Sequence, residues 1–477
     1  MKSSLTFVVL FLTSFAFSQE LFWSAETEVA SGYGNLRPRI ALTSNNVPII
    51  VWGGGTGAQP VYVSRLNGGA FSTPIAVSPS GINPYTANWT GPDIAAKGDS
   101  VWVIYDAELN SGFDVYNVTS TDAGVSFSDT VNISGYSGLN RFASIGSNVN
   151  GDIAASYMAH DANWTNPRYV VSNSADAGTT WQTPINASEA LSGAEVCDCC
   201  PSEIILNGSN QALLFRDNNA NLRDMWASFS ADGGATFPIG GDVDDAEWVL
   251  NACPSSGAHG AFINNSFYMV WMTGASGASK AMITTVDKSN AISTTNWGMP
   301  GVQQGSQNYP RIAGEGNTIG VVYQEYISGS PGYECYFAYT FDGDSKLDSI
   351  ALLNEQPLAS QTNPDVVFAD GVFHFVYQNG YTGGVTYRTA IVGSVGINEV
   401  NKTISIFPNP AVNEITLDGV SNSRIQLLNQ LGEVLLSKKV YNDKESIDCS
   451  QFATGTYFVQ VIQNNQLLQS KKVVIIR

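Results

Sequence analysis

Basic residues, long apolar runs and helical periodicity are all scarce in this sequence. It has 22 Lys and Arg against 41 Asp and Glu, for a net charge of −19. A field of that sign repels phosphate backbones, so we expect no nucleic-acid partner. The longest apolar run, Leu5 to Phe15, is too short to span a bilayer, and we expect no transmembrane segment in the mature chain. What remains is short apolar or alternating runs between Gly, Asn, Asp and Ser clusters, which predict an all-β protein.

The first residues have the pattern of a secretory signal peptide. Lys2 precedes the apolar run, and Ala16-Phe17-Ser18 follows it with small residues at the −3 and −1 positions of a cleavage site. We therefore predict that residues 1–18 are a signal peptide cleaved after Ser18, the alternative being a buried first strand. In an exported protein, the 6 cysteines indicate disulfides before metal ligands.

An internal repeat runs through most of the chain. Each copy begins with a Pro-x-Ile-Ala element or a variant of it, and a strand rich in Val, Trp and Tyr follows about ten residues later. Successive copies begin about 50 to 59 residues apart, which suits four strands and their turns, the size of one propeller blade. The seven first elements begin at Pro38, Pro92, Ala143, Pro201, Gly257, Pro310 and Pro364.

Seven copies predict a seven-bladed β-propeller over residues 19–393, with a six-bladed ring as the alternative. After Tyr377 only one further strand remains, from Gly384 to Val392, so the last copy is one strand short. The segment Leu21 to Val29 precedes the first copy and has no other place. We expect it to complete the last sheet, beside Val372 to Tyr377, so that no sheet edge stays open.

Three copies share a sharper pattern in the turn after the third strand, with Ser, Asp, Gly and an aromatic residue at fixed spacing. This pattern resembles the Asp-box, or bacterial neuraminidase repeat (BNR), hairpin of sialidase-like propellers. The resemblance implies that the Asp side chain bonds to the turn backbone, that Gly takes a positive φ, and that the ring packs between blades. The Asp-box resemblance indicates a fold and does not indicate a catalytic activity. The three segments are Ser120 to Phe127, Ser174 to Trp181 and Ser230 to Phe237.

After Gly393 the repeat ends and another pattern begins. Its parts resemble, in order and up to the last residue, the C-terminal sorting domain (type A) of the type IX secretion system. The resemblance implies a linker at 394–402, a small β-sandwich at 403–477, export through the type IX machinery by way of the periplasm, and release or attachment at the outer-membrane surface. The matching segments are Ile406 to Pro410, Leu428 to Gly432, Phe452 to Val459 and Lys471 to Ile476.

The second residue of the Pro-x-Ile-Ala element is the first place to look for function. Inner propeller strands line the central channel, and this position is charged in most copies although only 13% of the chain is charged. Charges there are costly unless they are paired or functional, so the set is either a ligand site or a ring of salt bridges. As ligand-binding residues we predict Arg39, Asp93, Glu203, His259, Arg311 and Asp365; the remaining copy has Ser144.

Two enzyme hypotheses remain open beside a binding function. The resemblance to sialidases nominates Arg39, Arg216 and Arg311 for a substrate carboxylate, with Tyr323 and Glu325 nearby, although six blades and a different arrangement are usual there. Seven-bladed polysaccharide lyases of the ulvan-degrading kind use His or Tyr as base and acid, with Arg neutralising a uronate carboxylate. For that chemistry the candidate catalytic residues are His160, Arg168 and Tyr169.

Four cysteines are expected to lie close together. Cys200-Pro201 and Cys253-Pro254 precede equivalent inner strands, so we predict that Cys253 is bonded to Cys199 or Cys200 and ties two neighbouring blades. Cys197 could pair with the remaining cysteine, or Cys199 and Cys200 could form a strained vicinal bridge. The alternative is a thiolate site with His259 for copper or zinc. An oxidising compartment favours disulfides over this site, so we expect no metal and no cofactor. We expect a secreted or surface propeller that binds a glycan or protein ligand at the channel mouth.

Overall fold

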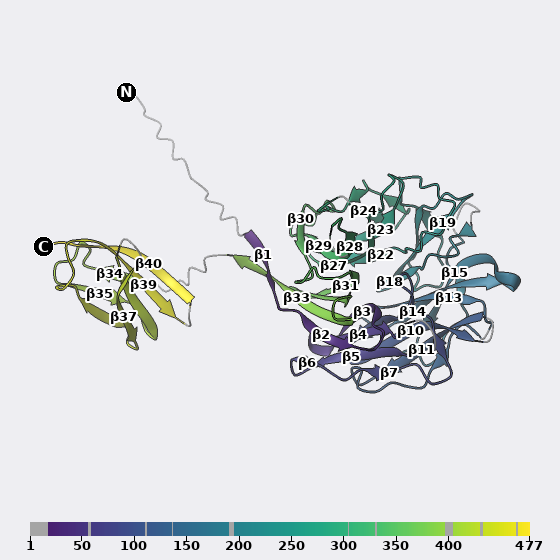
Figure 1. Ribbon diagram of the computed structural model, residues 1–477, viewed down its shortest axis with the longest axis horizontal. Coiled ribbons are helices and arrows are strands. Elements are labelled where there is room, and N and C mark those ends of the chain that lie inside the picture. The colour runs from purple at the N-terminus through teal and green to yellow at the C-terminus, as the bar shows by residue number, and fades with distance from the viewer. Residues whose placement is uncertain are drawn as a thin grey trace, which may run out of the picture. The chain divides into compact units, whose positions relative to one another are not determined.

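The computed structural model describes residues 18–55, 59–109, 112–135, 137–189, 195–303, 305–329, 332–395, 404–429, 433–463 and 466–477. The chain forms two compact units, Gln19–Gly393 and one that contains Ser394–Arg477 (Figure 1). Residues 1–17 of the predicted signal peptide and 396–403 around the predicted linker lie outside the described residues. The described regular structure is β, apart from two 3₁₀ turns, η1 (Ser44–Asn46) and η2 (Ala162–Trp164). None of the described helices is long and apolar enough to cross a membrane.

Within the described part of Gln19–Gly393 the strands form seven antiparallel sheets of four or five strands. We number them by chain order of their first repeat element. Sheet 1 contains β3 (Leu36–Thr43), β4 (Val47–Gly53), β5 (Val61–Asn67), β6 (Ala70–Phe71) and β7 (Ile75–Ala76). Sheet 2 contains β8 (Asn83–Pro84), β9 (Asp93–Lys97), β10 (Ser100–Leu109), β11 (Gly112–Ser120) and β12 (Val131–Asn132). Sheet 3 contains β13 (Asn140–Ser147), β14 (Ile153–Asp161), β15 (Thr165–Ser174) and β16 (Ile185–Asn186). Sheet 4 contains β17 (Glu195–Val196), β18 (Glu203–Asn207), β19 (Asn210–Asn218), β20 (Met225–Ser230) and β21 (Ile239–Asp242).

The remaining sheets of this unit follow the same order. Sheet 5 contains β22 (His259–Ile263), β23 (Ser266–Thr273), β24 (Lys280–Asp287), β25 (Ile292–Ser293) and β26 (Trp297–Gly298). Sheet 6 contains β27 (Gln307–Glu315), β28 (Thr318–Tyr326), β29 (Tyr333–Thr340) and β30 (Ser349–Leu352). Sheet 7 contains β31 (Gln361–Ala369), β32 (Val372–Asn379), β33 (Gly384–Val395), β1 (Ser18–Trp23) and β2 (Thr27–Ser31).

The sheets of this unit contact one another in a closed cycle. The strands that carry the repeat element touch in the order β3, β9, β13, β18, β22, β27, β31 and back to β3. In Figure 1 several of these strands lie around the middle of the unit. Among the described residues, a buried hydrophobic cluster lies between each pair of neighbouring sheets, including one between sheets 7 and 1. Because each sheet packs on both faces, second strands such as β19 are buried along almost their whole length.

The last sheet is completed by the beginning of the chain, as the sequence analysis predicted. Sheet 7 has the order β1, β33, β32, β31, and β2 also pairs with β33. Thr27 lies opposite Tyr387 and Ser31 opposite Gly384 in an antiparallel register. The two ends of the repeat region are thereby hydrogen-bonded to each other, which removes an open sheet edge.

The three Ser-x-Asp turns, at Ser120 to Phe127, Ser174 to Trp181 and Ser230 to Phe237, share one hydrogen-bond pattern. In the first, Asp122 Oδ1 accepts from the Ser126 backbone N–H at 2.9 Å, and Gly124 N–H donates to Ser120 Oγ at 2.8 Å. Gly124 has a φ of 82°, which favours glycine. The bonds from Ser126 and Ser120 lower the pKa of Asp122 to about 2. The aromatic residues that end the turns pack against the clusters between sheets; they are Phe127, Trp181 and Phe237.

The C-terminal unit has two antiparallel sheets that share one hydrophobic core. The core combines Ile415 and Leu417 of the smaller sheet with Ile425, Val459 and Val473 of the larger one. Leu431 and Gly432, part of one predicted motif, lie outside the described residues. The smaller sheet contains β34 (Ser405–Phe407), β35 (Glu414–Asp418) and β38 (Lys444–Asp448). The larger sheet contains β36 (Ser423–Leu428), β37 (Val434–Val440), β39 (Gly455–Gln463) and β40 (Gln466–Ile475).

Candidate functional site

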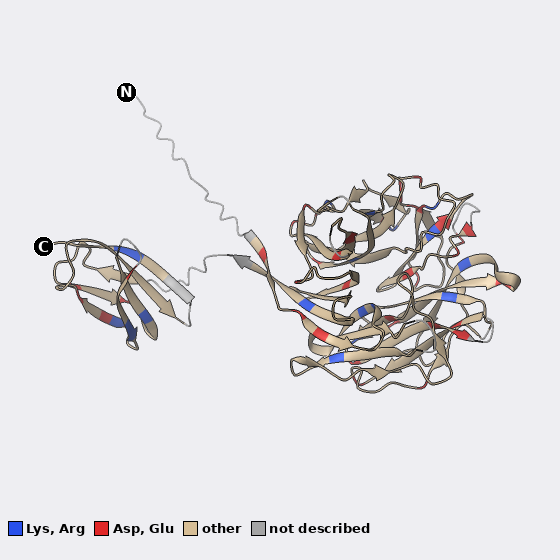
Figure 2. Cartoon of the chain, in the orientation of Figure 1, with Lys and Arg blue, Asp and Glu red and all other residues tan. Residues whose placement is uncertain are grey.

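The cycle of repeat strands encloses a cavity of about 410 Å³. This volume lies within the usual range for small-molecule sites. Figure 2 shows how sparse charged residues are over the chain, yet five of the six predicted ligand-binding residues line this one cavity. The rest of the lining consists mainly of Ile, Ala, Val and Gly. The five are Asp93, Glu203, His259, Arg311 and Asp365.

Four of the repeat strands carry a β-bulge just before the second position of the repeat element, which is charged in three of them and Ser144 in β13. The register of β3 breaks between Leu36 and Arg39, and β13, β27 and β31 break at the equivalent place. A bulge re-aims the side chains beside it, and such bulges recur near binding sites. At each bulge one residue other than glycine has a positive φ, namely Arg37 (50°), Phe142 (60°), Tyr309 (52°) and Asn363 (53°).

Arg311 is the centre of a buried ion-pair layer. Its Nη1 lies 2.8 Å from Glu203 Oε2, and its Nε lies 3.0 Å from Asp365 Oδ1. Burial lowers the pKa of Arg311, but the charges of the carboxylates outweigh this and raise it above its ordinary value. Burial raises the pKa of Glu203 to about 7, with Arg311 opposing that shift. These three side chains therefore satisfy one another, which is the salt-bridge alternative of the sequence analysis.

Asp93 and His259 also have partners within the protein. Asp93 Oδ2 accepts from Ser144 Oγ at 3.0 Å and from the Ile145 backbone N–H at 3.1 Å. His259 Nδ1 accepts from the Ile312 backbone N–H at 3.1 Å. Burial, followed by the charges of Arg311 and Arg39, lowers the pKa of His259 well below its ordinary value. His259 is thus a neutral acceptor that joins two neighbouring strands.

Arg39, the sixth predicted residue, is the exception. Only 4% of it is exposed, and no ion pair within 4 Å joins it to a carboxylate among the described residues. Its Nη1 donates to the Pro38 carbonyl at 2.7 Å, and its Nε has no partner there. Burial, and then the charges of Arg37 and Arg311, lower the pKa of Arg39 well below its ordinary value. The protein thus holds a guanidinium whose charged form is poorly compensated.

Arg37, two residues earlier, is a second buried arginine whose described hydrogen-bond partners are backbone carbonyls. It is 7% exposed, and its Nη1 donates only to carbonyls, those of Gly91 at 3.3 Å and Pro92 at 3.2 Å. Arg37 and Arg39 line a second cavity of about 30 Å³, which is room for one small group and not for a sugar ring. Glu203 and Arg311 line both cavities, so the ion-pair layer separates them. Half-buried Trp89 and Tyr309 also line the smaller one.

Sequence reasoning missed Arg37, Trp89 and Tyr309 as parts of the site. A regular strand alternates its side chains, and the bulge in β3 breaks that alternation at Arg37. The only available signal was the closely spaced pair of arginines in Arg37-Pro38-Arg39. Trp89 lies between β8 and β9, where no repeat position points to it.

The lyase candidates do not converge on one cleft. Arg168 and Tyr169 are consecutive in β15, so their side chains point to opposite faces of sheet 3. Tyr169 is fully buried in the core, where its hydroxyl donates to the Cys200 carbonyl. Arg168 forms a surface ion pair with Asp161 at 2.9 Å. The half-buried His160 bonds through Nδ1 to the Leu139 carbonyl at 3.2 Å.

The sialidase candidates are also dispersed. Arg216 is fully buried away from the channel cavities and donates to three backbone carbonyls, including that of Met272. The Tyr323 hydroxyl donates to the Pro300 carbonyl at 2.5 Å. Glu325 accepts from the backbone N–H groups of residues 302, 303 and 305. Each group has a structural partner, and the described residues do not gather them as a catalytic set.

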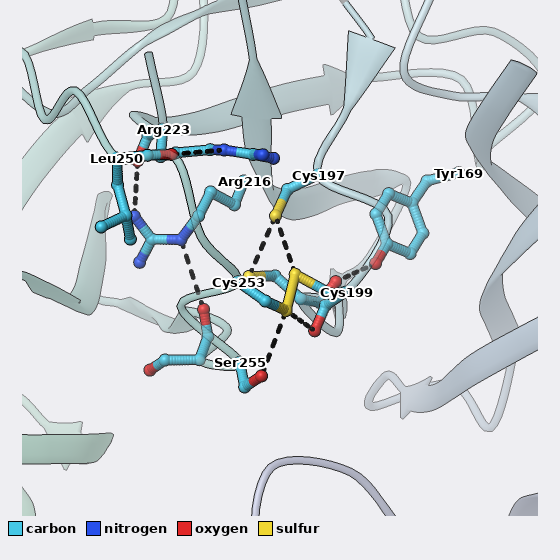
Figure 3. The surroundings of a disulfide bond; sticks show 10 residues. Tyr169, Cys197, Cys199, Arg216, Arg223, Leu250, Cys253 and Ser255 are labelled. Carbon is cyan, nitrogen blue, oxygen red and sulfur yellow. Dashed lines mark hydrogen bonds between the residues drawn. A yellow bond between two sulfur atoms is a disulfide. The ribbon is translucent and has the colours of Figure 1, made fainter. Parts of the chain in front are cut away.

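A disulfide between Cys199 and Cys253 joins sheet 4 to sheet 5, with their Cα atoms 6.1 Å apart (Figure 3). This is one of the two pairings predicted from the repeat. The expected second bridge is absent, because Cys197 and Cys200 are buried free thiols with their sulfurs 3.3 Å apart, well beyond the bond length of about 2.05 Å. Among the described residues, the sulfurs of residues 197, 199 and 200 lie within 4.8 Å of one another, without His259.

Comparison with solved structures finds similar folds at low identity. The chain aligns with PorZ, a surface component of the type IX secretion system of Porphyromonas gingivalis, at 12% identity and a TM-score of 0.46, covering 94% of this chain and 60% of PorZ. It aligns with a family PL25 ulvan lyase at 11% identity and 0.49, covering 78% and 96% of the two chains. The Hadza microbial sialidase Hz136 gives 12% and 0.42, covering 74% of each. Similarities at this level assign no activity.

The C-terminal unit gives the firmer result. No curated protein sequence matches the chain, but residues 405–476 match the family model of the secretion system C-terminal sorting domain. This range begins at β34 and ends with the last strand, so the match spans both sheets of the unit. The chain is therefore an all-β protein that carries a type IX sorting domain and is exported by that system to the cell surface or beyond.

Proposed function

We propose that residues 19–393 form a seven-bladed β-propeller of the Asp-box type, preceded by a signal peptide at 1–18 and followed by a linker at 394–402 and a β-sandwich sorting domain at 403–477. The closed cycle of strand contacts, with a hydrophobic cluster between neighbouring sheets, supports the ring. The hydrogen bonds of the three Ser-x-Asp turns support the Asp-box assignment. The single core shared by two sheets supports the sandwich.

We further propose that the exported protein binds a glycan or protein ligand at the channel mouth, through a carboxylate of that ligand. The observation that carries this proposal is the pair of buried guanidinium groups, Arg37 and Arg39, which lie beside a cavity and form no ion pair with a carboxylate in the described part of the chain. A buried charge without a partner is costly, and functional sites are where such costs are retained. Arginine is also the side chain best suited to bind a carboxylate in a bidentate manner.

The volume of the smaller cavity limits which chemical group of the ligand can enter it. About 30 Å³ accepts a carboxylate, while a sugar ring or peptide backbone has to remain outside. The half-buried residues Trp89 and Tyr309 lie at the same cavity, and we propose that their aromatic rings pack against the apolar side of a sugar held outside it. A uronate or sialate residue combines both features, so acidic glycans are the first ligands to test.

The test begins with the mature chain on an array of acidic and neutral glycans, followed by calorimetry on the best ligand. Arg39→Gln should lose most of the affinity, because it removes the unpaired charge. Arg168→Gln is the matched control, since Arg168 is a surface arginine outside the channel. Equal affinity in Arg39→Gln and wild type would refute the proposed site. Release of unsaturated uronate or free sialate by the wild type would replace binding with catalysis as its function.

A further inference from the structure

The second unusual site lies where the loop between β17 and β18 meets the loop between β21 and β22. It consists of Cys197, Cys199, Cys200 and Cys253, which we call the four-cysteine cluster. The Cys199–Cys253 bond joins the two loops, and the other two members are free thiols. Cys197 and Cys200 are fully buried, whereas Cys253 is exposed. A buried dithiol thus lies beside a disulfide that reaches the surface.

The distances in the cluster place a thiol against the disulfide. Cys197 Sγ lies 3.5 Å from Cys199 Sγ and 3.3 Å from Cys200 Sγ, and Figure 3 shows its sulfur pointing toward the bridge. Thiol–disulfide exchange requires a sulfur nucleophile that can reach a disulfide sulfur, and Cys197 Sγ lies close to one. The tight surroundings hold the geometry, because the Cys197 backbone N–H donates to the Arg216 carbonyl at 2.8 Å.

We propose that the four-cysteine cluster is an internal thiol–disulfide exchange site, in which the bridge moves to Cys197 and Cys200 and the exposed Cys253 thiol is freed. The inference does not depend on the proposed ligand site.

The exchange takes place in two balanced steps. In the first, Cys200 loses its proton to water and its thiolate takes the proton of Cys197, Cys197 Sγ bonds to Cys199 Sγ, and the Cys199–Cys253 bond breaks. Cys253 leaves as a thiolate and takes up a proton from water. In the second step, Cys200 loses its proton to water and its sulfur attacks Cys197 Sγ, and Cys199 leaves as a thiolate that is protonated in turn. One disulfide and two thiols are present throughout, so no oxidant or reductant is consumed.

The electrostatics of the cluster place the shared proton on Cys197. The hydrogen bond to Cys200, and then burial, raise the pKa of the Cys197 thiol far above its ordinary value, so the first proton transfer is uphill and limits the rate of exchange. The Cys197 thiol donates to Cys200 Sγ. Burial raises the pKa of Cys200, but this donated bond and the Arg216 charge outweigh it and lower the pKa to about 7. Cys200 is therefore a proton acceptor at neutral pH, 3.3 Å from the thiol that has to lose its proton.

The experiment traps the freed thiol in the folded mature chain. After non-reducing peptide mapping confirms the starting bridge, the protein is incubated with N-ethylmaleimide at neutral pH, quenched in acid and mapped by fragmentation. We expect time-dependent alkylation of Cys253, together with peptides bridged from Cys197 to Cys199 or Cys200. Cys197→Ser should abolish the alkylation of Cys253. Cys200→Ser removes both the proton acceptor of the first step and the nucleophile of the second, so it should slow the alkylation of Cys253 and leave Cys197–Cys199 as the only new bridge. Cys335→Ser, which removes a buried thiol outside the cluster, should change nothing.

Several results would overturn the exchange site. Cys253 could remain unlabelled in the wild type, or be labelled equally in Cys197→Ser. The isolated chain could instead contain two bridges that use all members of the cluster, or four thiols with a stoichiometric metal ion. Melting temperature and near-ultraviolet circular dichroism establish that each variant is folded, and Cys197→Ala replaces Cys197→Ser if the serine hydroxyl disturbs the core.

Discussion

Arg39 at the start of sheet 1 and Arg311 at the start of sheet 6 occupy the same place in two copies of one repeat, yet their surroundings differ. Both follow a proline, precede Ile-Ala and lie just after a bulge in a buried strand. Arg311 has two carboxylate partners, at 2.8 and 3.0 Å. Within the described ranges, the hydrogen-bond partner of the Arg39 side chain is the Pro38 carbonyl, at 2.7 Å.

The reason for the difference lies in how Asp365, which belongs to the sheet between these two, uses its oxygens. Sheet 7 neighbours both sheet 6 and sheet 1, and it contributes Asp365. Asp365 uses Oδ1 for Arg311 and Oδ2 for the Ile40 backbone N–H at 3.0 Å, so both of its oxygens are occupied. The repeat therefore determines where an arginine is placed, whereas the neighbouring sheets determine whether its charge is compensated. We therefore propose Arg39, and not Arg311, for ligand binding.

The largest expected effect on stability is at Arg311, the arginine with two carboxylate partners. Arg311→Met keeps much of the side-chain volume but leaves Glu203 and Asp365 buried without a cation. We expect the free energy of unfolding to fall by about 3 to 5 kcal/mol, as when one partner of a buried ion pair is removed. Arg168→Met removes a surface pair and should cost less than about 1 kcal/mol. Urea titrations of both variants measure this, and similar losses in the two would mean that the buried layer contributes nothing special.

Some features of the fold and of the candidate site could be predicted from the sequence, and others could not. The repeat predicted the strands, the pairing of Leu21 to Val29 with the last sheet, the channel lining and the choice of Cys199 or Cys200 for Cys253. The partner of each charge was not predictable, because it depends on which oxygens of Asp365 the backbone of a distant strand takes. The bulge that aims Arg37 is likewise a local break of the period-two rule. The proximity of His160, Arg168 and Tyr169 in the sequence was misleading, because consecutive strand residues point to opposite faces.

A smaller effect is expected from pH, through Glu203. Its pKa rises from an ordinary 4.5 to about 7 in the folded chain, so between these values the folded state binds more protons than the unfolded state. Stability contributed by this group is therefore present below about pH 4.5 and is lost as the pH rises through about 7. The loss over the whole window is on the order of 3 kcal/mol, at about 1.4 kcal/mol per pKa unit.

Glu203→Gln isolates this contribution from other titrating groups. Unfolding free energies of the wild type and the variant are measured at pH 4.5 and pH 7.5, and the decrease should be smaller in the variant. An equal decrease would show that Glu203 titrates in the same way in both states, and that the Arg311 ion pair fully compensates its burial.

The smallest effect on stability is expected at Arg39, and it is the sharpest test of the comparison. Arg39→Met orphans no carboxylate and removes a charge that burial disfavours, so the free energy of unfolding should change by less than about 1 kcal/mol or increase. Ligand affinity should nevertheless fall at least about tenfold, because a hydrogen bond to a charged group is worth about 1.5 to 3 kcal/mol. Arg311→Met provides the contrast, because its free energy of unfolding should fall strongly. Its ligand affinity is measured under conditions where it remains folded. If Arg39→Met instead destabilises the protein as much as Arg311→Met does, Arg39 is a structural cation, and the distinction between paired and free arginines in this channel is wrong.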